Sequence, residues 1–208
     1  RTANTLLALG MRPTLTVDAD EIDAFTAAAD ALLVNLGMMD AVRAAAIPRA
    51  ITAARRLGKP WVLDPVFVDV SPQRRAFALD CLAGGPAVLK TNAAETVLGA
   101  EANAACVHVT TGAVDRITAG ARSAGFANGH PLGARVTAMG CALGAVIAAA
   151  TAVTDDAFAA ACAAVALYGV AGDIAGEGAP GPGTFAARFY DALSTLDGAT
   201  VIHRMRTP

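Results

Sequence analysis

Residues 135–150 read Arg-Val-Thr-Ala-Met-Gly-Cys-Ala-Leu-Gly-Ala-Val-Ile-Ala-Ala-Ala. The second half is apolar and rich in small side chains, which is typical of a helix that packs closely against a sheet. The first half supplies a hydroxyl at Thr137, a flexible Gly140 and then Cys141 in the first turn. Because the first amides of a helix lack intrahelical partners and carry the positive end of the helix dipole, this stretch predicts a binding site for an anion such as phosphate.

Cys141 is the reactive side chain of this stretch. A cysteine at a helix N-terminus is expected to have a lowered pKa and a larger thiolate fraction. Cys141 is therefore a candidate base or nucleophile beside the anion. The alternative is a small buried cysteine that fills a helix–sheet contact, and this stretch alone slightly favours that packing role.

The composition narrows the class of protein. With 208 residues, the chain is long enough for one domain with a substantial core. Hydrophobic residues make up 55% and charged residues 16%, so part of the surface is expected to be apolar or covered by partners. The net charge of −2 argues against binding to nucleic acid or to an anionic membrane. The nearest apolar run to a membrane span, residues 141–153, is too short.

The four cysteines are scattered and form no C-x-x-C pair, and no secretory segment is present. This pattern predicts a reduced, cytoplasmic protein. The sequence begins at Arg1 in mid-pattern, so the natural N-terminus is expected to lie upstream of it.

Apolar periodicity predicts strands that alternate with helices. We expect helices at 2–9, 18–30 (with Asp18 or Asp20 as the cap), 40–57, 73–83, after Asn92, and at 138–153, 155–175 and 183–196. We expect strands at 14–17, 31–36, 61–64, 87–90 and 106–110, then an antiparallel pair at 115–119 and 123–127 around Gly120. This order predicts a single domain spanning residues 1–208, with three α/β/α layers, a mostly parallel central sheet and a helical C-terminal half.

Polar residues follow four of the predicted parallel strands. In such sheets, ligands bind outside the carboxyl ends of the strands, so these residues are expected to converge with the helix that carries Cys141. They are Asn35 and Gly37, Asp64 and Pro65, Lys90 to Asn92 with Glu95, and Thr111 with Gly112.

Eight short motifs carry a family resemblance. Each is weak alone, but their order and spacing are specific as a set. They are Thr2-Ala-Asn-Thr-Leu-Leu-Ala-Leu-Gly10, Leu63-Asp64-Pro65-Val66, Thr91-Asn-Ala-Ala-Glu95, Thr111-Gly-Ala-Val-Asp115, Asn128-Gly-His-Pro-Leu132, Val136-Thr-Ala-Met-Gly-Cys141, Tyr168-Gly-Val-Ala-Gly172 and Gly181-Pro-Gly-Thr-Phe185. Together they resemble the hydroxyethylthiazole kinases, thiamine-pathway members of the ribokinase-like superfamily.

The resemblance implies ATP-dependent phosphorylation of the primary alcohol of 4-methyl-5-(2-hydroxyethyl)thiazole. It also implies a homotrimer whose thiazole site lies at the subunit interface. Cys141 occupies the place of the family's cysteine, where most ribokinase relatives have an aspartate, and the resemblance gives it the role of a base. The amides of Ala138, Met139 and Gly140 would complete an anion hole for the transferring phosphoryl group.

The resemblance also implies metal and nucleotide contacts. The Asn92-x-x-Glu95 motif would organise Mg²⁺ and its waters near the phosphates, with Asp64 as the second carboxylate. Without the family context, Asn92 would be an ordinary N-cap and Glu95 part of a solvated helix face. Lys90 stands where the family usually has an arginine, so the charge is kept but the bidentate fork is lost. Lys90, Asn92, Thr111 and Gly112 would bind the nucleotide.

The thiazole would contact Leu15, Asn35, Gly37 and Ala138. Leu15 stands where the family often has a methionine of similar volume. The family's usual Gly-Thr-Gly before the cysteine is Ala138-Met139-Gly140 here, so the main chain at residue 138 is expected to have negative φ. The family's first strand would precede Arg1.

The connection before the strand at 106–110 is also shorter than in the family. We expect that a segment between about 100 and 106 is missing from this sequence, because a parallel crossover needs about a dozen residues or more. Two other functions stay open. One is a kinase for another small heterocyclic alcohol such as hydroxymethylpyrimidine, and the other is a non-catalytic trimer that binds thiazole or nucleotide.

Overall fold

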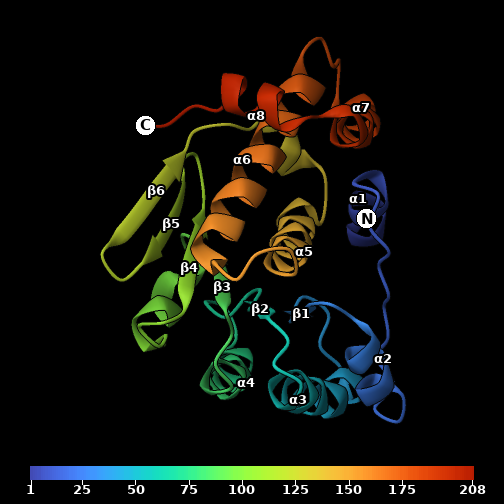
Figure 1. The fold of residues 1–208 in the computed structure, drawn as a ribbon, viewed down its shortest axis with the longest axis vertical. Coiled ribbons are helices and arrows are strands. Elements are labelled where there is room, and N and C mark those ends of the chain that lie inside the picture. The colour runs from blue at the N-terminus through green and yellow to red at the C-terminus, as the bar shows by residue number, and fades with distance from the viewer.

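Six strands form one sheet in the order β1-β2-β3-β4-β5-β6 in the computed structural model, which describes residues 1–208 (Figure 1). The first four strands are parallel, and the last two run antiparallel as a hairpin. The strands are β1 (Leu32–Asn35), β2 (Trp61–Asp64), β3 (Val88–Asn92), β4 (Val107–Thr111), β5 (Asp115–Ala119) and β6 (Arg122–Phe126). The prediction of a mostly parallel sheet is confirmed.

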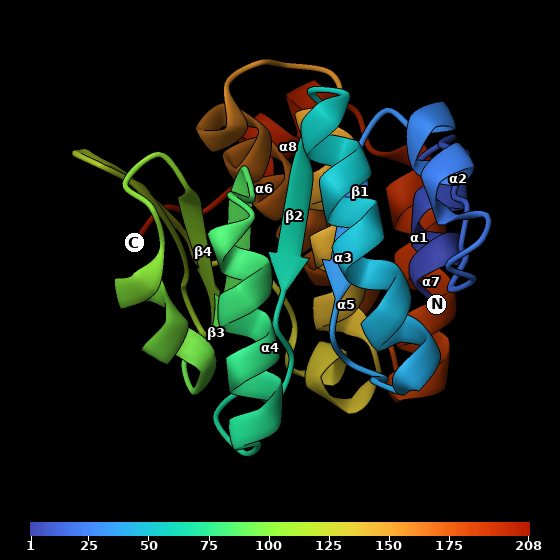
Figure 2. The ribbon, with the colours of Figure 1, turned by 90° about the horizontal axis from the view of Figure 1, so that it is seen from below.

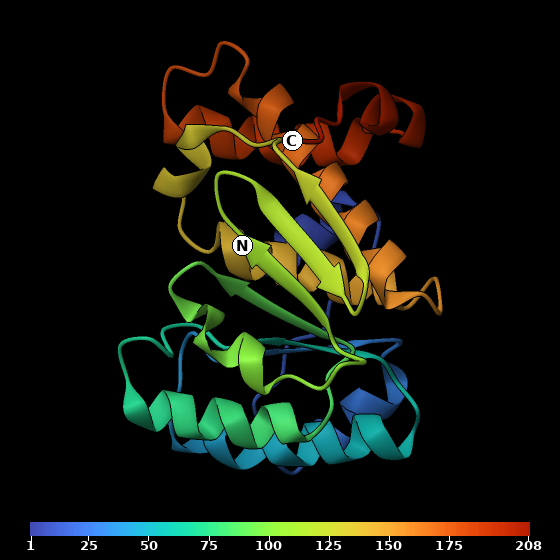
Figure 3. The same ribbon diagram turned by 90° about the vertical axis from the view of Figure 1, so that its left-hand side faces the viewer.

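Helices cover both faces of the sheet. In Figures 1 and 3, α3 and α4 lie on one face, and α5 and α6 lie on the other. Helices α1 and α7 pack against α5 and α6 on that side. The chain from α5 to α8 is all helical, as the sequence predicts for the C-terminal half. The helices are α1 (Thr2–Ala8), α2 (Ile22–Ala28), α3 (Ala41–Arg56), α4 (Pro72–Ala83), α5 (Met139–Thr151), α6 (Ala157–Gly176), α7 (Pro182–Thr195) and α8 (Gly198–Arg204), with 3-10 helices η1 (Glu95–Glu101) and η2 (Pro131–Arg135).

Small residues let α5 approach the sheet. A Cβ placed on Gly144 would lie 3.3 Å from the Leu33 side chain and 3.5 Å from Asp64 Oδ2. A larger side chain would hold the helix away from β1 and β2, since packed interiors have few voids to absorb it. The small-residue pattern of residues 141–150 therefore determines how closely the start of α5 meets the sheet.

Two predicted features of the N-terminal region are wrong. Residues 14–17 form no strand: their β-branched residues favour extended chain, but the segment does not pair with β1, whose outer side stays open at the edge of the sheet. Neither Asp18 nor Asp20 caps α2, because the N-cap residue is Glu21. Asp18 instead accepts a hydrogen bond of 2.8 Å from the amide of Asp20, a local turn that precedes the helix.

Two C-terminal helices also depart from the expectations. Helix α8 was not predicted; it is short, and Asp197 caps it by accepting from the amide of Thr200. Helix α6, not residues 141–153, is the segment long and apolar enough to cross a membrane by length and composition. Half of that stretch is buried inside the protein, where it forms the centre of the larger core cluster.

The connection from β3 to β4 is short. Between Asn92 and Val107 the chain forms only η1 before β4 pairs in parallel with β3. Fourteen residues close this crossover, near the minimum for a parallel connection. The expectation of a missing segment near residues 100–106 stays a prediction.

Candidate active site

The predicted polar residues do converge at one end of the sheet. In Figure 2 the arrow of β2 points toward the end of the molecule at which α5 begins. Asn35 and Asp64 are register partners at the carboxyl ends of β1 and β2. Lys90 lies on the neighbouring strand β3, and the first turn of α5 packs against this group.

A buried ion pair lies at the centre of the cluster. Lys90 Nζ donates to Asp64 Oδ1 at 3.1 Å, and the two side chains are 6% and 0% exposed. Asn35 Nδ2 donates to the other Asp64 oxygen at 2.6 Å. Burial raises the pKa of Asp64 above its usual value, and the charge of Glu95 adds to the shift, whereas Lys90 and Asn35 oppose it. Burial dominates because a charged carboxylate loses its hydration there.

Gly37 holds the Asn35 side chain in this orientation. Its amide donates to Asn35 Oδ1 at 3.0 Å, while a Cβ on residue 37 would lie 2.9 Å from the same oxygen. Only glycine leaves room for this contact. The structure thus brings Asn35 and Gly37 to the cluster, but Leu15 lies 72% exposed on the segment between α1 and α2.

The main chain at the start of α5 is strained. Ala138 is the N-cap residue with φ of 64° and ψ of 16°, in the left-handed region, so the expectation of negative φ is wrong. No side chain caps this helix, and Thr137 does not supply the expected hydroxyl. Two residues after Ala138, a Cβ on Gly140 would lie 3.2 Å from Lys90 Nζ. Gly140 therefore leaves space for the ammonium group beneath the first turn.

Cys141 lies half-buried in this turn, and its pKa is raised, not lowered. Burial is the largest cause, followed by the negative charge of Asp64; the Asn35 side chain and the Lys90 charge act in the opposite direction. The expectation of a lowered pKa is wrong, because burial and the adjacent carboxylate both disfavour the thiolate. Cys141 is a neutral thiol in the free protein.

Glu95 is buried and bonded through both oxygens. Oε1 accepts from the amide of Phe67 at 2.9 Å, and Oε2 accepts from the amide of Asn92 at 3.1 Å. Asn92 Oδ1 in turn accepts from the amides of Ala94 and Glu95, which forms a local turn at the end of β3. The N-cap residue of η1 is Ala94, so the prediction that Asn92 caps that helix is wrong. Glu95 is 3% exposed, which excludes a solvated helix face. Phe67 and Ala138 are the two non-glycine residues with positive φ, and both adjoin this cluster.

Asp64 and Glu95 are the two carboxylates of the cluster that could serve as metal ligands. Their charges are close enough for Glu95 to raise the pKa of Asp64. No group of three or more His, Cys, Asp or Glu side chains is placed to hold a metal ion by itself. Two carboxylates with no softer ligand suit Mg²⁺, which keeps several waters and takes its other oxygens from substrate phosphates.

The end of β4 carries the remaining predicted residues. Thr111 Oγ1 donates to the carbonyl oxygen of Thr91 at 3.2 Å. The amide of Gly112 donates to Asp115 Oδ1 at 2.9 Å, which forms the turn into the β5–β6 hairpin. Thr111 and Gly112 thus lie at the carboxyl end of the parallel strands, as expected. Their contact with a nucleotide stays a prediction.

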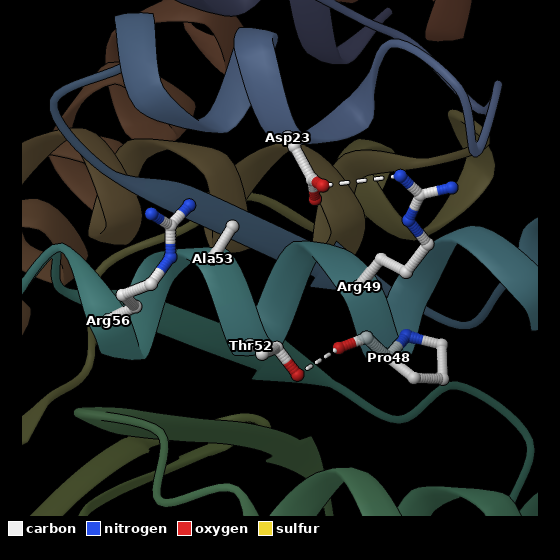
Figure 4. A pocket seen from close by; sticks show the side chains of 6 residues that line it. All are labelled: Asp23, Pro48, Arg49, Thr52, Ala53 and Arg56. Atoms are coloured by element: carbon white, nitrogen blue, oxygen red, sulfur yellow. Dashed lines mark hydrogen bonds and ion pairs between the residues drawn. The ribbon is translucent and has the colours of Figure 1, made fainter.

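A separate hollow lies between α2 and α3, away from the cluster at the carboxyl ends of the strands (Figure 4). Arg49 pairs across it with Asp23 at 3.2 Å, and Thr52 bonds back to the carbonyl oxygen of Pro48 in its own helix. None of the predicted site residues lines this hollow.

Comparison with known proteins identifies the family. The sequence model of the hydroxyethylthiazole kinase family matches residues 1–105 and 99–199. The chain belongs to the hydroxyethylthiazole kinase family. A probable hydroxyethylthiazole kinase of Agrobacterium fabrum is 43% identical over 205 residues, which cover 99% of this chain and 83% of that protein. The hydroxyethylthiazole kinase of Granulibacter bethesdensis is 41% identical over 95% of this chain and 81% of its own length.

Solved structures agree with this family assignment. The hydroxyethylthiazole kinase protein from Pyrococcus horikoshii superposes with a TM-score of 0.93 at 32% identity, over 100% of this chain and 87% of that one. The pyridoxal kinase from Staphylococcus aureus in complex with ADP shares the fold, with a TM-score of 0.62 at 14% identity over 83% of this chain and 81% of that one. The predicted ribokinase-like fold and the predicted kinase family are confirmed.

Replacement of Ala138 by glycine is expected to stabilise the protein. Left-handed backbone costs an alanine roughly 1–2 kcal/mol, and glycine adopts it without this cost but loses more entropy on folding. We expect a net gain of about 0.5–1 kcal/mol in the free energy of unfolding, measured by urea denaturation. The control Ala149→Gly, inside the same helix, should lose a similar amount. A destabilised Ala138→Gly protein would contradict the observed backbone.

Alkylation tests the pKa of Cys141. Because only the thiolate reacts and the pKa is raised, the rate of reaction with iodoacetamide should keep rising through pH 9. Peptide mass spectrometry in a Cys162→Ser background would follow Cys141 alone, since Cys81 and Cys106 are buried with pKa values raised to about 12 and about 11. A rate that levels off near neutral pH would show a lowered pKa instead.

Proposed function

We propose that this protein phosphorylates the hydroxyethyl group of 4-methyl-5-(2-hydroxyethyl)thiazole with ATP, a step of thiamine biosynthesis or salvage. The observation that carries the proposal is the buried Asp64–Lys90 pair directly beneath the first turn of α5. A fixed ammonium and the free amides of a helix start are the two kinds of group that stabilise a transferring phosphoryl group. Family membership supplies the substrate.

The residues of the first turn would act together on the phosphoryl group. The amides of Ala138, Met139, Gly140 and Cys141 would bind its oxygens beside the charge of Lys90, because the first amides of a helix lack intrahelical partners. The alcohol oxygen attacks the γ-phosphorus as the bond to the β-phosphate oxygen breaks and ADP leaves. Because the transition state is loose, positioning and charge carry most of the catalysis.

Cys141 would orient the alcohol in this reaction. With a raised pKa, its thiol is neutral before attack, so we assign it to holding the substrate hydroxyl by hydrogen bonding at Sγ. A loose transition state needs little proton removal in advance, so the alcohol proton would leave late, to an oxygen of the transferred phosphoryl group and from there to water. Asn35 and Gly37 at the end of β1 would border the thiazole.

Asp64 and Glu95 would hold Mg²⁺ through its waters. When bound with ATP, the ion would neutralise charge on the phosphates. The amides of Phe67 and Asn92 fix the Glu95 carboxylate, and Lys90 and Asn35 fix that of Asp64. In this proposal the nucleotide is bound by Lys90, Asn92, Thr111 and Gly112.

We also propose a cytoplasmic homotrimer with interface active sites. Nine of the thirteen exposed large hydrophobic side chains lie within the first 70 residues, including Leu15 and also Met38, which follows Gly37 in sequence. All four cysteines are free, as in a reducing compartment. Light scattering coupled to size exclusion should give the mass of three copies of the chain. The mass of one copy would contradict the trimer.

A coupled assay of ADP release tests the function. With Mg²⁺ and ATP, turnover should depend on hydroxyethylthiazole. Cys141→Ala should lower kcat by about 10–100-fold through lost positioning, whereas Cys141→Asp should retain activity because it restores a polar group. Cys162→Ala is the matched control and should leave kcat unchanged.

Three other outcomes would redirect the proposal. Thiazole binding by calorimetry without turnover would favour a non-catalytic trimer. Turnover with hydroxymethylpyrimidine alone would assign another heterocyclic alcohol. An unchanged kcat in Cys141→Ala would remove Cys141 from the mechanism.

A further inference from the structure

A buried tyrosine contacts the main chain of the proposed anion hole. The hydroxyl of Tyr168, on α6, donates a hydrogen bond of 2.8 Å to the carbonyl oxygen of Met139, the first residue of α5. Tyr168 is 9% exposed and far from Met139 in sequence. We propose that Tyr168 is a positioning residue that fixes the direction of the Gly140 amide toward the phosphoryl group. This inference rests on the proposed phosphoryl transfer at the start of α5.

Peptide geometry explains how a contact to one residue orients the next. The carbonyl of Met139 and the N–H of Gly140 belong to one peptide group, which is planar and trans, so the two bonds point in opposite directions. A hydrogen bond that holds the carbonyl oxygen therefore also fixes the N–H. This peptide group lies beside Lys90, since a Cβ on Gly140 would approach Nζ to 3.2 Å. The Gly140 N–H and the Lys90 charge then serve the same anion.

The start of α5 needs such an external restraint. Ala138 has φ of 64°, and a non-glycine residue stays in that region only where its surroundings hold it. Helices usually fix their first turn through the side chain of the N-cap residue, but here no side chain caps the helix. The Tyr168 hydroxyl supplies, from a neighbouring helix, a restraint that the local sequence lacks.

Tyr168 is itself held rigidly. Its ring packs edge-to-face on Phe189 of α7, with centroids 4.8 Å apart, and Phe189 stacks on Phe185 at 6.1 Å. Both phenylalanines are fully buried. Burial also raises the pKa of Tyr168 above its usual value, so the phenol keeps its proton and always acts as a donor. The aromatic contacts thus connect α7 to the first turn of α5.

Tyr168→Phe isolates the hydroxyl, because the ring and its packing remain. We expect kcat for thiazole phosphorylation to fall at least fivefold, with KM for ATP and for thiazole within twofold of wild type. Tyr190→Phe, which removes a phenol hydroxyl from α7, is the matched control and should retain kcat. A merely structural role would lower the melting temperature of Tyr168→Phe without lowering kcat in the folded range.

A rescue experiment tests the connection to Ala138. Glycine adopts the left-handed region without strain, so Tyr168→Phe should cost less activity when Ala138→Gly is already present. Equal losses in both backgrounds would overturn the proposed restraint on this turn.

Amide resonances separate this inference from the proposed function. In ¹⁵N-labelled protein, the Gly140 resonance should move on titration with inorganic phosphate, and Tyr168→Phe should shift that resonance and weaken its response. This holds even if the thiazole is not phosphorylated, in which case the proposed function alone fails. A Gly140 resonance and a kcat that are both unchanged in Tyr168→Phe would overturn the role of Tyr168.

Discussion

The buried ion pair between Asp64 and Lys90 is the interaction on which the rest of the site depends. Both side chains are almost fully removed from water, on neighbouring parallel strands. Taking two charges out of water costs several kcal/mol each, and their attraction offsets this cost only with good geometry and further hydrogen bonds. Asn35 supplies such a bond to Asp64. A pair of this kind adds little to stability, and we interpret it as a charge kept in place for an anionic substrate.

The fit between this pair and α5 explains two features of the sequence. Gly140 and Gly144 bring the helix close to Lys90 and Asp64. The compact ammonium of Lys90 fits beneath Gly140, where a Cβ would approach Nζ to 3.2 Å. The close approach also leaves Cys141 half-buried against Asp64, which explains why its pKa is raised. The close approach of α5 to the sheet thus determines the position of the Lys90 charge, the space beneath Gly140 and the raised pKa of Cys141.

Much of the fold and the location of the site were predictable from the sequence. Apolar runs with polar residues at their ends identify parallel strands, and parallel strands bring their carboxyl ends to one edge, so Asn35, Asp64 and Lys90 were expected to meet. The strand predicted at 14–17 was wrong because local propensity does not show whether an extended segment pairs with the sheet.

Other properties depend on contacts between distant segments. The pKa of Cys141 follows from burial and from Asp64, neither of which appears in the local sequence. The contact of Tyr168 with Met139 joins two helices through a main-chain oxygen, for which side-chain patterns carry no signal. The left-handed backbone of Ala138 was missed because alanine is not a residue that favours it.

The most direct test of the central claim combines stability with activity in Asp64→Asn, Lys90→Met and the double variant. Each single variant leaves one buried group unpaired and should lose roughly 3–5 kcal/mol in the free energy of unfolding by urea denaturation. The double variant should regain most of that stability and yet show no thiazole-dependent release of ADP. A double variant that still turns over substrate, or two losses that simply add, would contradict the claim that this pair is kept for the phosphoryl site.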